Sequence, residues 1–319
     1  MLIIQALPRI NHGLLITLKN LTNRSKIVGH NINNVPTYYK GEQMKKLLLS
    51  LILAITALTG INALAWTQRA PQDPQTCKVH APYGFPQTAG ITPICRQAYL
   101  VGYDAAAKLP KYVTYELLPQ NALGCVARTN AFAADQSVPG GAIPADYAGT
   151  GYDKGHMSPD GDLSWDPQVE YESFLMTNMS PQAGSLNRGI WKLLETSVRG
   201  WAVQRNQSYT VYVGGVYNAQ DKTIGKGVVV PHGFYKIVVN NQTKEIAGWA
   251  FPHVAPYPNL GNDLTKFRLP IAQIEQAGGV QFAFPPGAVE LQPGKEWPVD
   301  FGALTNAKRA KCGANASDD

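Results

Sequence analysis

The most restrictive feature of this 319-residue chain is a glycine-flanked histidine in Tyr152–His156, followed some 30 residues later by Asn187 and Glu195. Glycine before the histidine removes the side chain that would keep a bulky anion away from the backbone. Lys154, in the same stretch, carries a positive charge that would meet such an anion. The segment therefore offers a general base beside a cation, which favours an anionic substrate.

A second pattern begins at Leu186. If this segment is helical, side chains four residues apart drift by only about 40° per step and share one stripe. Amide and carboxylate oxygens are hard ligands suited to Mg²⁺, and a guanidinium nearby indicates phosphate chemistry. The residues on this predicted stripe are Asn187, Trp191, Glu195 and Arg199.

Three linked motifs resemble the signature of the non-specific DNA/RNA endonucleases of the ββα-metal (His-Me finger) superfamily. That family's core has D-R-G-H, S-N-x-x-P-Q and L-N-x-x-x-W-x-x-L-E in this order. The matching segments here are Asp153–His156, Thr177–Gln182 and Leu186–Glu195. The resemblance extends over roughly residues 80 to 290, the length of a whole domain. Lys154 stands where the family usually has arginine, and lysine meets a phosphate as a point charge without the bidentate fork.

The resemblance implies three central roles in the site. His156 is the general base that takes a proton from the water attacking phosphorus. Asn187 is the direct ligand of Mg²⁺, with Mn²⁺ as the ion that can replace it. Glu195 does not bind the ion directly and instead orients the water molecules that are bound to it.

Other residues are assigned to binding and support. Lys154, Arg128 and Arg199 are candidates to hold the scissile or a neighbouring phosphate. Arg128 matches the family only loosely, so a solvated loop arginine is the alternative for that position. Asp153 is expected to hydrogen-bond loop amides so that His156 is presented correctly, and Asn178 is expected to organise its loop.

By resemblance, the chain is a magnesium-dependent endonuclease that acts on DNA and RNA and leaves 5′-phosphates. Two alternatives stay open: a nucleic-acid-binding module that lost its chemistry, and a phosphodiesterase acting on another substrate such as a phospholipid. An inhibitor protein as partner also stays open, because the sequence carries no sign of one. The sequence leaves the oligomeric state open.

Residues 44–65 have the pattern of a secretory signal. A basic start at Lys45 and Lys46 precedes an apolar run, Leu47–Ile61, and a small-x-small site, Ala63–Ala65. A membrane anchor is the alternative, but the run is shorter than the ~20 residues needed to span a bilayer. We expect export to the periplasm or medium, with no stable membrane association after cleavage.

The signal divides the chain into three parts. Residues 1–43 are expected to derive from an upstream start, with a true extension as the alternative, and residues 66–319 to form one endonuclease domain with a loop-rich N-terminal arm. The chain has 28 Lys and Arg against 22 Asp and Glu. Residues 1–65 hold seven of the basic residues and one of the acidic residues, which leaves 21 basic and 21 acidic residues in the rest of the chain. Any electropositive surface must therefore be a local groove.

An even number of cysteines in an exported chain indicates disulfides. All four cysteines lie after residue 65, and three pairings are possible. We favour the one that ties the N-terminal arm to itself and the C-terminal tail to the body. The bonds in this pairing are Cys77–Cys95 and Cys125–Cys312.

The expected fold class is α+β, with a central antiparallel sheet, flanking helices and, by resemblance, a ββα-metal core. Runs rich in β-branched and aromatic residues between turn residues predict a meander. Its strands are expected at Tyr209–Val216, Gly227–Val230, Phe234–Asn240 and Glu245–Phe251. The helix after Leu186 is expected to be capped by Ser185 and closed by Gly200.

Overall fold

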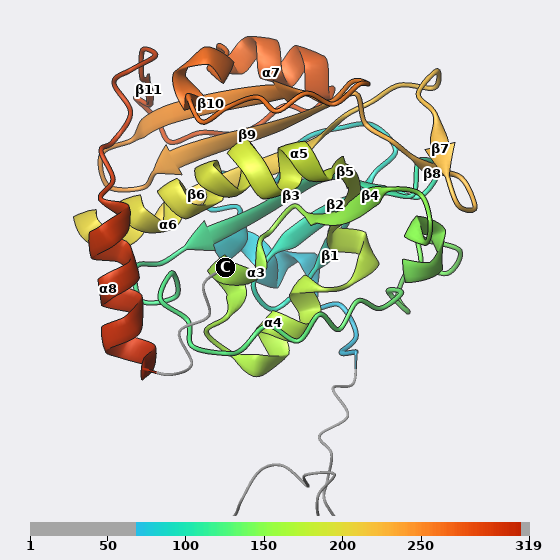
Figure 1. Cartoon of the computed structure of the whole chain (residues 1–319), viewed down its shortest axis with the longest axis horizontal. Helices are drawn as coiled ribbons and strands as arrows, with labels where there is room; N and C mark the ends of the chain where they lie inside the picture. Colours follow the sequence, from blue (N-terminus) through green and yellow to red (C-terminus); the bar gives the residue numbers. More distant parts are fainter. Residues whose placement is uncertain (1–67, 314–319) are drawn as a thin grey trace, which may run out of the picture. The chain divides into compact units, whose positions relative to one another are not determined.

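The structure, a computed structural model, describes residues 68–313 and is organised around a seven-stranded sheet (Figure 1). The strand order is β1-β2-β3-β6-β9-β10-β11. Neighbouring strands are antiparallel except β10 and β11, which are parallel. The strands are β1 (Thr92–Cys95), β2 (Leu100–Asp104), β3 (Leu109–Leu117), β6 (Tyr209–Val216), β9 (Gly233–Asn240), β10 (Glu245–Pro252) and β11 (Val289–Glu290).

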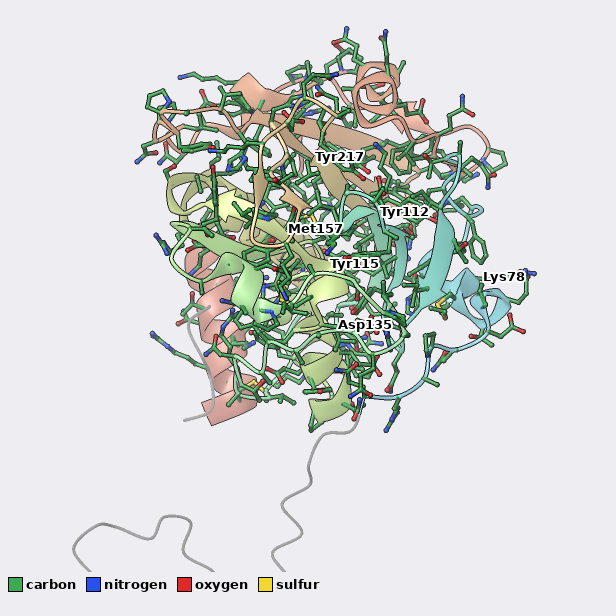
Figure 2. The ribbon with its side chains drawn as sticks, turned by 90° about the vertical axis from the view of Figure 1, so that its right-hand side faces the viewer. Lys78, Tyr112, Tyr115, Asp135, Met157 and Tyr217 are labelled. Atoms are coloured by element: carbon green, nitrogen blue, oxygen red, sulfur yellow. A yellow bond between two sulfur atoms is a disulfide. The ribbon has the colours of Figure 1, made fainter. Side chains whose placement is uncertain are left out.

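The sheet buries both of its faces, because successive side chains of a strand point to opposite sides. On β3, Tyr112 and Tyr115 lie an odd number of residues apart and pack into different hydrophobic clusters (Figure 2). On β9, Val238 belongs to the cluster of Tyr115, whereas Ile237 and Val239 belong to that of Tyr112. Most residues of β9 are accordingly apolar, as expected of a strand that is buried on both faces.

Helices cover each face, which gives three layers. The Tyr115 side is covered by α6 (Lys192–Arg205) together with α3 (Asp160–Leu163) and α4 (Pro167–Ser173). The Tyr112 side is covered by α7 (Ile271–Gly278) and η1 (Pro74–His80). The expected α+β class is confirmed. The remaining helices are η2 (Pro144–Tyr147), η3 (Met176–Asn178), α5 (Gly184–Leu186), η4 (Asn187–Trp191), η5 (Leu264–Phe267) and α8 (Phe301–Cys312).

A separate two-stranded ribbon leads directly into α6 (Figure 1). It pairs β4 (Tyr152–His156) with β5 (Met179–Ala183) in antiparallel register, with Gly155 opposite Ser180. The chain then passes through α5 and η4 into α6. Two strands followed by a helix thus carry all three sequence motifs, the second of them on η3 and β5.

The helix that follows differs from the prediction. It is kinked at Gly189 (φ −104°, ψ −120°), where a single turn of π-helix precedes α6. Ser185 does not cap it, because its hydroxyl donates to the carbonyl of Tyr257 at 2.8 Å. Gly200 lies within α6 rather than at its end; a Cβ there would lie 2.2 Å from Cγ2 of Val299, so close packing requires the glycine. Left-handed Asn206 (φ 52°) ends the helix instead.

Three of the four predicted meander strands lie side by side as β6, β9 and β10. The fourth was wrong: residues 227–230 contribute β8 (Val228–Val229), which pairs with β7 (Thr223–Ile224) in a hairpin of its own. Gly225 (φ 51°) and Gly227 (φ 91°) supply the left-handed turn that folds this hairpin back. The hairpin therefore interrupts the meander between β6 and β9.

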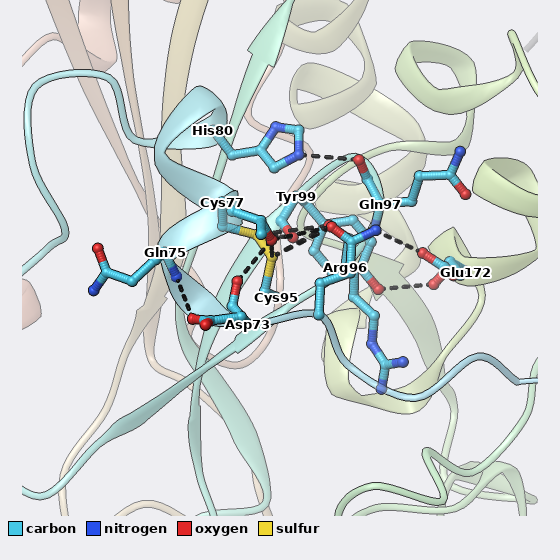
Figure 3. The surroundings of a disulfide bond; sticks show 11 residues. Asp73, Gln75, Cys77, His80, Cys95, Arg96, Gln97, Tyr99 and Glu172 are labelled. Carbon is cyan, nitrogen blue, oxygen red and sulfur yellow. Dashed lines mark hydrogen bonds between the residues drawn. A yellow bond between two sulfur atoms is a disulfide. The ribbon is translucent and has the colours of Figure 1, made fainter.

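Both disulfides are present with the favoured pairing. Cys77–Cys95 joins η1 to β1, with Cα atoms 5.7 Å apart, and lies beside Arg96 and Tyr99 (Figure 3). Cys125–Cys312 joins the loop after β3 to the end of α8, with Cα atoms 5.2 Å apart. The second bond closes a loop of 187 residues, against 18 for the first.

The predicted extension at 1–43 and signal at 44–65 lie outside the described residues, so both stay predictions. Within residues 68–313, no helix has the length and apolar character needed to cross a membrane.

Loss of the Cys125–Cys312 bond should destabilise the fold more than loss of the Cys77–Cys95 bond. Chain entropy grows with the size of the closed loop, and loops of 187 and 18 residues differ by about 2 kcal/mol in this respect. Denaturant unfolding of the two double Cys→Ser variants measures the difference. Equal losses of unfolding free energy, or a larger loss for the Cys77–Cys95 pair, would contradict the chain-entropy account.

Candidate active site

One pocket brings together the six residues to which the sequence assigned a role in catalysis, metal binding or phosphate binding. β4 supplies two of them, the η4–α6 segment three, and the loop after β3 one. The lining residues are Arg128, Lys154, His156, Pro159, Asp160, Gly161, Asn187, Arg188, Lys192, Glu195 and Arg199. Five of these side chains are basic and two are acidic, so the pocket has a local positive excess.

His156 is a buried, neutral base at the wall of the pocket. Its ring meets the edge of Phe174 at 4.9 Å and lies 5.8 Å from Phe132, measured between ring centroids. Burial, and next the positive charge of Arg128, hold the pKa of His156 well below its usual range. The apolar packing of the ring against Phe132 and Phe174 is the physical reason for this depression. Nε2 has no hydrogen-bond partner among residues 68–313.

Asn187 is oriented by Asp153 from the neighbouring strand. The Asn187 side-chain Nδ2 donates to Oδ2 of Asp153 at 3.0 Å, and Arg188 Nη1 lies 2.9 Å from the other carboxylate oxygen. With its nitrogen committed, the amide keeps its oxygen for a ligand. Asp153 was expected to bind loop amides; its carboxylate instead receives two side chains of η4.

Glu195 has a buried partner that the sequence analysis missed. Lys236 on β9 is fully buried, and its Nζ lies 3.6 Å from Oε1 of Glu195 and 4.7 Å from the ring centroid of Trp191. Burial raises the pKa of Glu195, and the positive charge of Lys236 is the largest opposing effect. A lysine inside the otherwise apolar run of β9 was the available signal, since lysine is almost never fully buried unless paired.

Arg199 is held by a second buried carboxylate, Asp162 of α3. Arg199 Nη1 lies 3.0 Å from Oδ1 of Asp162, whose Oδ2 accepts a hydrogen bond of 2.7 Å from the hydroxyl of Tyr115. Asp162 therefore holds the Arg199 guanidinium in place at the lining of the pocket. Asp162 could not be predicted from local sequence, because the contact joins residues 37 apart.

Arg128 also lines the pocket, and its side chain is exposed. Its Nη1 lies 3.2 Å from Oδ2 of Asp160, and its guanidinium stacks 4.9 Å from the ring centroid of Phe174. At the next residue of the loop, the backbone N–H of Thr129 donates a 2.7 Å hydrogen bond to Glu170. Burial, opposed in part by that hydrogen bond, raises the pKa of Glu170 to about 7. Stacking and ion pairing thus position Arg128 over the pocket.

Lys154 completes the basic rim. Its Nζ lies 4.6 Å from the ring centroid of Phe132, the same ring that contacts His156. Strand alternation places Lys154 and His156 on one face of β4. The ammonium therefore lies beside the base, where the anionic substrate was expected.

Asn178 and Gly155 support the site from outside the pocket. The Asn178 amide bonds both backbone groups of Ser158, at 2.9 and 2.8 Å, and the carbonyl of Ser173, as expected of a loop organiser. Gly155 serves strand pairing rather than anion approach: a Cβ there would lie 1.9 Å from Oε1 of buried Gln182.

The pocket suits a hard cation that keeps most of its water molecules, rather than a cation coordinated by protein ligands alone. Among residues 68–313, no group of three or more His, Cys, Asp and Glu side chains is arranged to hold a metal. Mg²⁺ usually keeps several waters and takes only one or two protein oxygens. The oriented amide oxygen of Asn187 matches that requirement, and the carboxylate of Glu195 in the same pocket suits a water molecule of the ion.

A model of the DNA/RNA non-specific endonuclease family matches residues 78–287, which include the whole pocket. The chain belongs to this family. Members of the DNA/RNA non-specific endonuclease family are hydrolases that act on phosphodiester bonds, so the chain is an enzyme of that class. The resemblance drawn from the three motifs is confirmed.

Individual relatives of this endonuclease agree with the assignment. The chain is 28% identical over 226 residues to a nuclease of Nostoc sp., covering 64% of this chain and 80% of the relative. It is 28% identical over 221 residues to human mitochondrial endonuclease G, and the match covers 63% of this chain and 72% of that relative. A solved EndoG/EndoGI complex has a chain with the same fold, with a TM-score of 0.56, 24% identity, and coverage of 67% and 93%.

Gly155→Ala should lower the unfolding free energy by about 1–3 kcal/mol, the usual cost of overpacking a buried site. The new Cβ would lie 1.9 Å from Gln182. The double variant with Gln182→Ala removes the clash and should recover part of the loss, which a denaturant-melt double-mutant cycle measures. Additive losses would show that the glycine is needed for another reason.

Proposed function

We propose that this chain is an exported, divalent-metal-dependent endonuclease that hydrolyses DNA and RNA without strong sequence preference. The observation that carries the proposal is the pocket in which neutral His156 and the oriented Asn187 amide face the same basic cavity. The family and the relatives, which are named as nucleases, support it.

His156 acts as the general base. Because its pKa is depressed, the imidazole is unprotonated at neutral pH and can accept a proton from the attacking water. A bond then forms between the water oxygen and phosphorus, the bond from phosphorus to the 3′ oxygen breaks, and the leaving 3′ oxygen takes a proton from a solvent water. The products are a 5′-phosphate and a 3′-hydroxyl. The apolar rings of Phe132 and Phe174 keep the base neutral.

Asn187 would hold a divalent cation, Mg²⁺ or Mn²⁺, and Glu195 would orient the water molecules around it. When bound, the cation supplies positive charge that stabilises the negative charge developing on the phosphate and the leaving oxygen. Asp153 fixes the Asn187 amide for this task. Lys236 favours the ionised form of Glu195 and so opposes the effect of burial, which raises the pKa of this carboxyl.

Arg128, Lys154 and Arg199 bind the phosphate groups. Their charges line the pocket, and two of them are positioned by carboxylates, Asp160 and Asp162. Phosphate contacts position a nucleic acid but carry no sequence information. DNA and RNA share this backbone, so a phosphate-reading pocket accounts for action on both.

Export rests on the predicted signal at residues 44–65 together with the two disulfides. Disulfides form and persist in oxidising compartments such as the periplasm and the medium. An inhibitor protein is a further candidate partner, since a structural neighbour was solved as an EndoG/EndoGI complex.

The decisive test is cleavage of plasmid DNA and RNA by purified residues 66–319 with Mg²⁺ or with EDTA. We expect metal-dependent cleavage of both, lowered by about 10²–10⁴-fold in His156→Ala, the usual contribution of general base catalysis. His232→Ala is the matched control, because His232 lies outside the pocket and pairs with Asp221. Cleavage that resists EDTA, or an active His156→Ala variant, would contradict the proposal.

Lys236→Met should move the acid limb of the pH profile for kcat/KM to higher pH. Lys236 lowers the pKa of Glu195. Without that charge the carboxyl binds its proton at higher pH, so its ionised form disappears sooner as pH falls. We expect a loss of about tenfold near pH 6 that shrinks toward pH 8.

Lys236→Arg, which keeps the charge, is the control, and a thermal melt checks the fold of both variants. An activity loss that is equal at all pH values would show that Lys236 acts through packing alone.

A further inference from the structure

Two tyrosines and a lysine gather beside the pocket but line no part of it. The Tyr152 ring at the start of β4 meets Tyr257 edge to face at 5.7 Å, and their hydroxyl groups are hydrogen-bonded to each other. Lys222 Nζ lies 5.0 Å from one ring centroid and 5.4 Å from the other. Both rings are partly exposed and Lys222 is exposed. We call these three residues the tyrosine–lysine cluster.

The cluster lies on the same strand face as the catalytic base. Side chains of β4 alternate, so Tyr152, Lys154 and His156 share one face, and the last two line the pocket. At about 3.4 Å per residue, the Cα of Tyr152 is roughly 13 Å from that of His156. A phosphate held at the cluster is therefore not the one beside His156 but lies further along the same strand.

The rings are held rigidly rather than left loose on a mobile loop. Tyr257 adopts a left-handed φ of 55°, and its carbonyl accepts a 2.8 Å hydrogen bond from Ser185 of α5. Its ring lies 4.8 Å from that of His253, between centroids. His253 in turn accepts from the backbone N–H of Ala183 at 2.8 Å. The tyrosine–lysine cluster is thus anchored to the β5–α5 segment that leads to Asn187.

An exposed ammonium beside aromatic rings has the composition that proteins use for unpaired nucleic acid. Aromatic rings stack with any base, because every base has a π-face, and a lysine meets the adjoining phosphate. A base inside a duplex is already stacked on both sides and cannot use such a platform. The expected ligand is therefore a single-stranded segment of DNA or RNA.

We propose that the tyrosine–lysine cluster is a nucleic-acid subsite that stacks an unpaired base and holds its phosphate a few nucleotides from the cleaved bond. The proposal rests on the endonuclease function proposed above and adds the part of the substrate that is recognised away from the reaction. It makes cleavage depend on substrate length and on unpaired bases, while the chemistry at His156 stays the same.

The test compares single-stranded oligonucleotides of about two and about twelve nucleotides, the longer being within the usual site size of such surfaces. The variants are Lys222→Ala and the double variant Tyr152→Leu/Tyr257→Leu, which keeps bulk but removes the rings. We expect KM for the long substrate to rise about tenfold with kcat little changed, as when stacking on a base is lost. The short substrate should be cleaved as by the wild type.

Three controls make the result specific. Lys226→Ala removes an exposed lysine from the same hairpin, outside the cluster, and should leave KM unchanged. Tyr152→Phe/Tyr257→Phe keeps the rings and should restore tight binding. A thermal melt of every variant excludes unfolding.

Equal losses on short and long substrates would overturn the subsite and assign the cluster to packing of the site. An unchanged KM on the long substrate would overturn it as well. Wild-type cleavage of the short oligonucleotide separates this from the proposed function: if the wild type cleaves neither substrate, the endonuclease proposal fails first.

Discussion

The pairing of buried charges between α6 and the layers beneath it is the constraint on which the site depends. Glu195 faces Lys236 of β9, and Arg199 faces Asp162 of α3. Removing one partner of a buried pair typically costs 3–5 kcal/mol, because an uncompensated charge remains. A shift of α6 along the sheet would separate both pairs at once. These pairs therefore fix the register of the helix, and with it the distance between its carboxylate and the base on β4.

The β4 strand divides its side chains between support and chemistry. On one face, Asp153 orients Asn187, and Gly155 leaves room for Gln182 of the partner strand. On the other face, Lys154 and His156 line the pocket. Because the strand period is two, these tasks are separated without any extra element. A slip of one residue against β5 would exchange the two sets, which is why the buried, glycine-dependent contact matters for activity as well as for packing.

Local sequence patterns predict the fold class and the motif residues of the site, whereas the partners of those residues depend on long-range contacts. The antiparallel strands and the motif around His156 follow from residue type and spacing, so the fold class and family could be predicted. Lys236 and Asp162 lie in other elements, and only packing shows that they face the helix. Gly200 looked like a helix end, yet it marks a close approach of Val299. A glycine has two common uses, and the sequence alone does not distinguish them.

The loop that carries Arg128 shows how the end of the chain can contribute to a site it does not enter. Arg128 follows Cys125 by three residues in a stretch without strand or helix, and the disulfide ties that stretch to Cys312 of α8. The same loop is fixed at Thr129 by buried Glu170. A flexible arginine would lose conformational entropy on binding phosphate. Two anchors, one on each side of Arg128, remove part of that cost before the substrate arrives, so the C-terminal helix acts on the pocket by preorganising its phosphate contact.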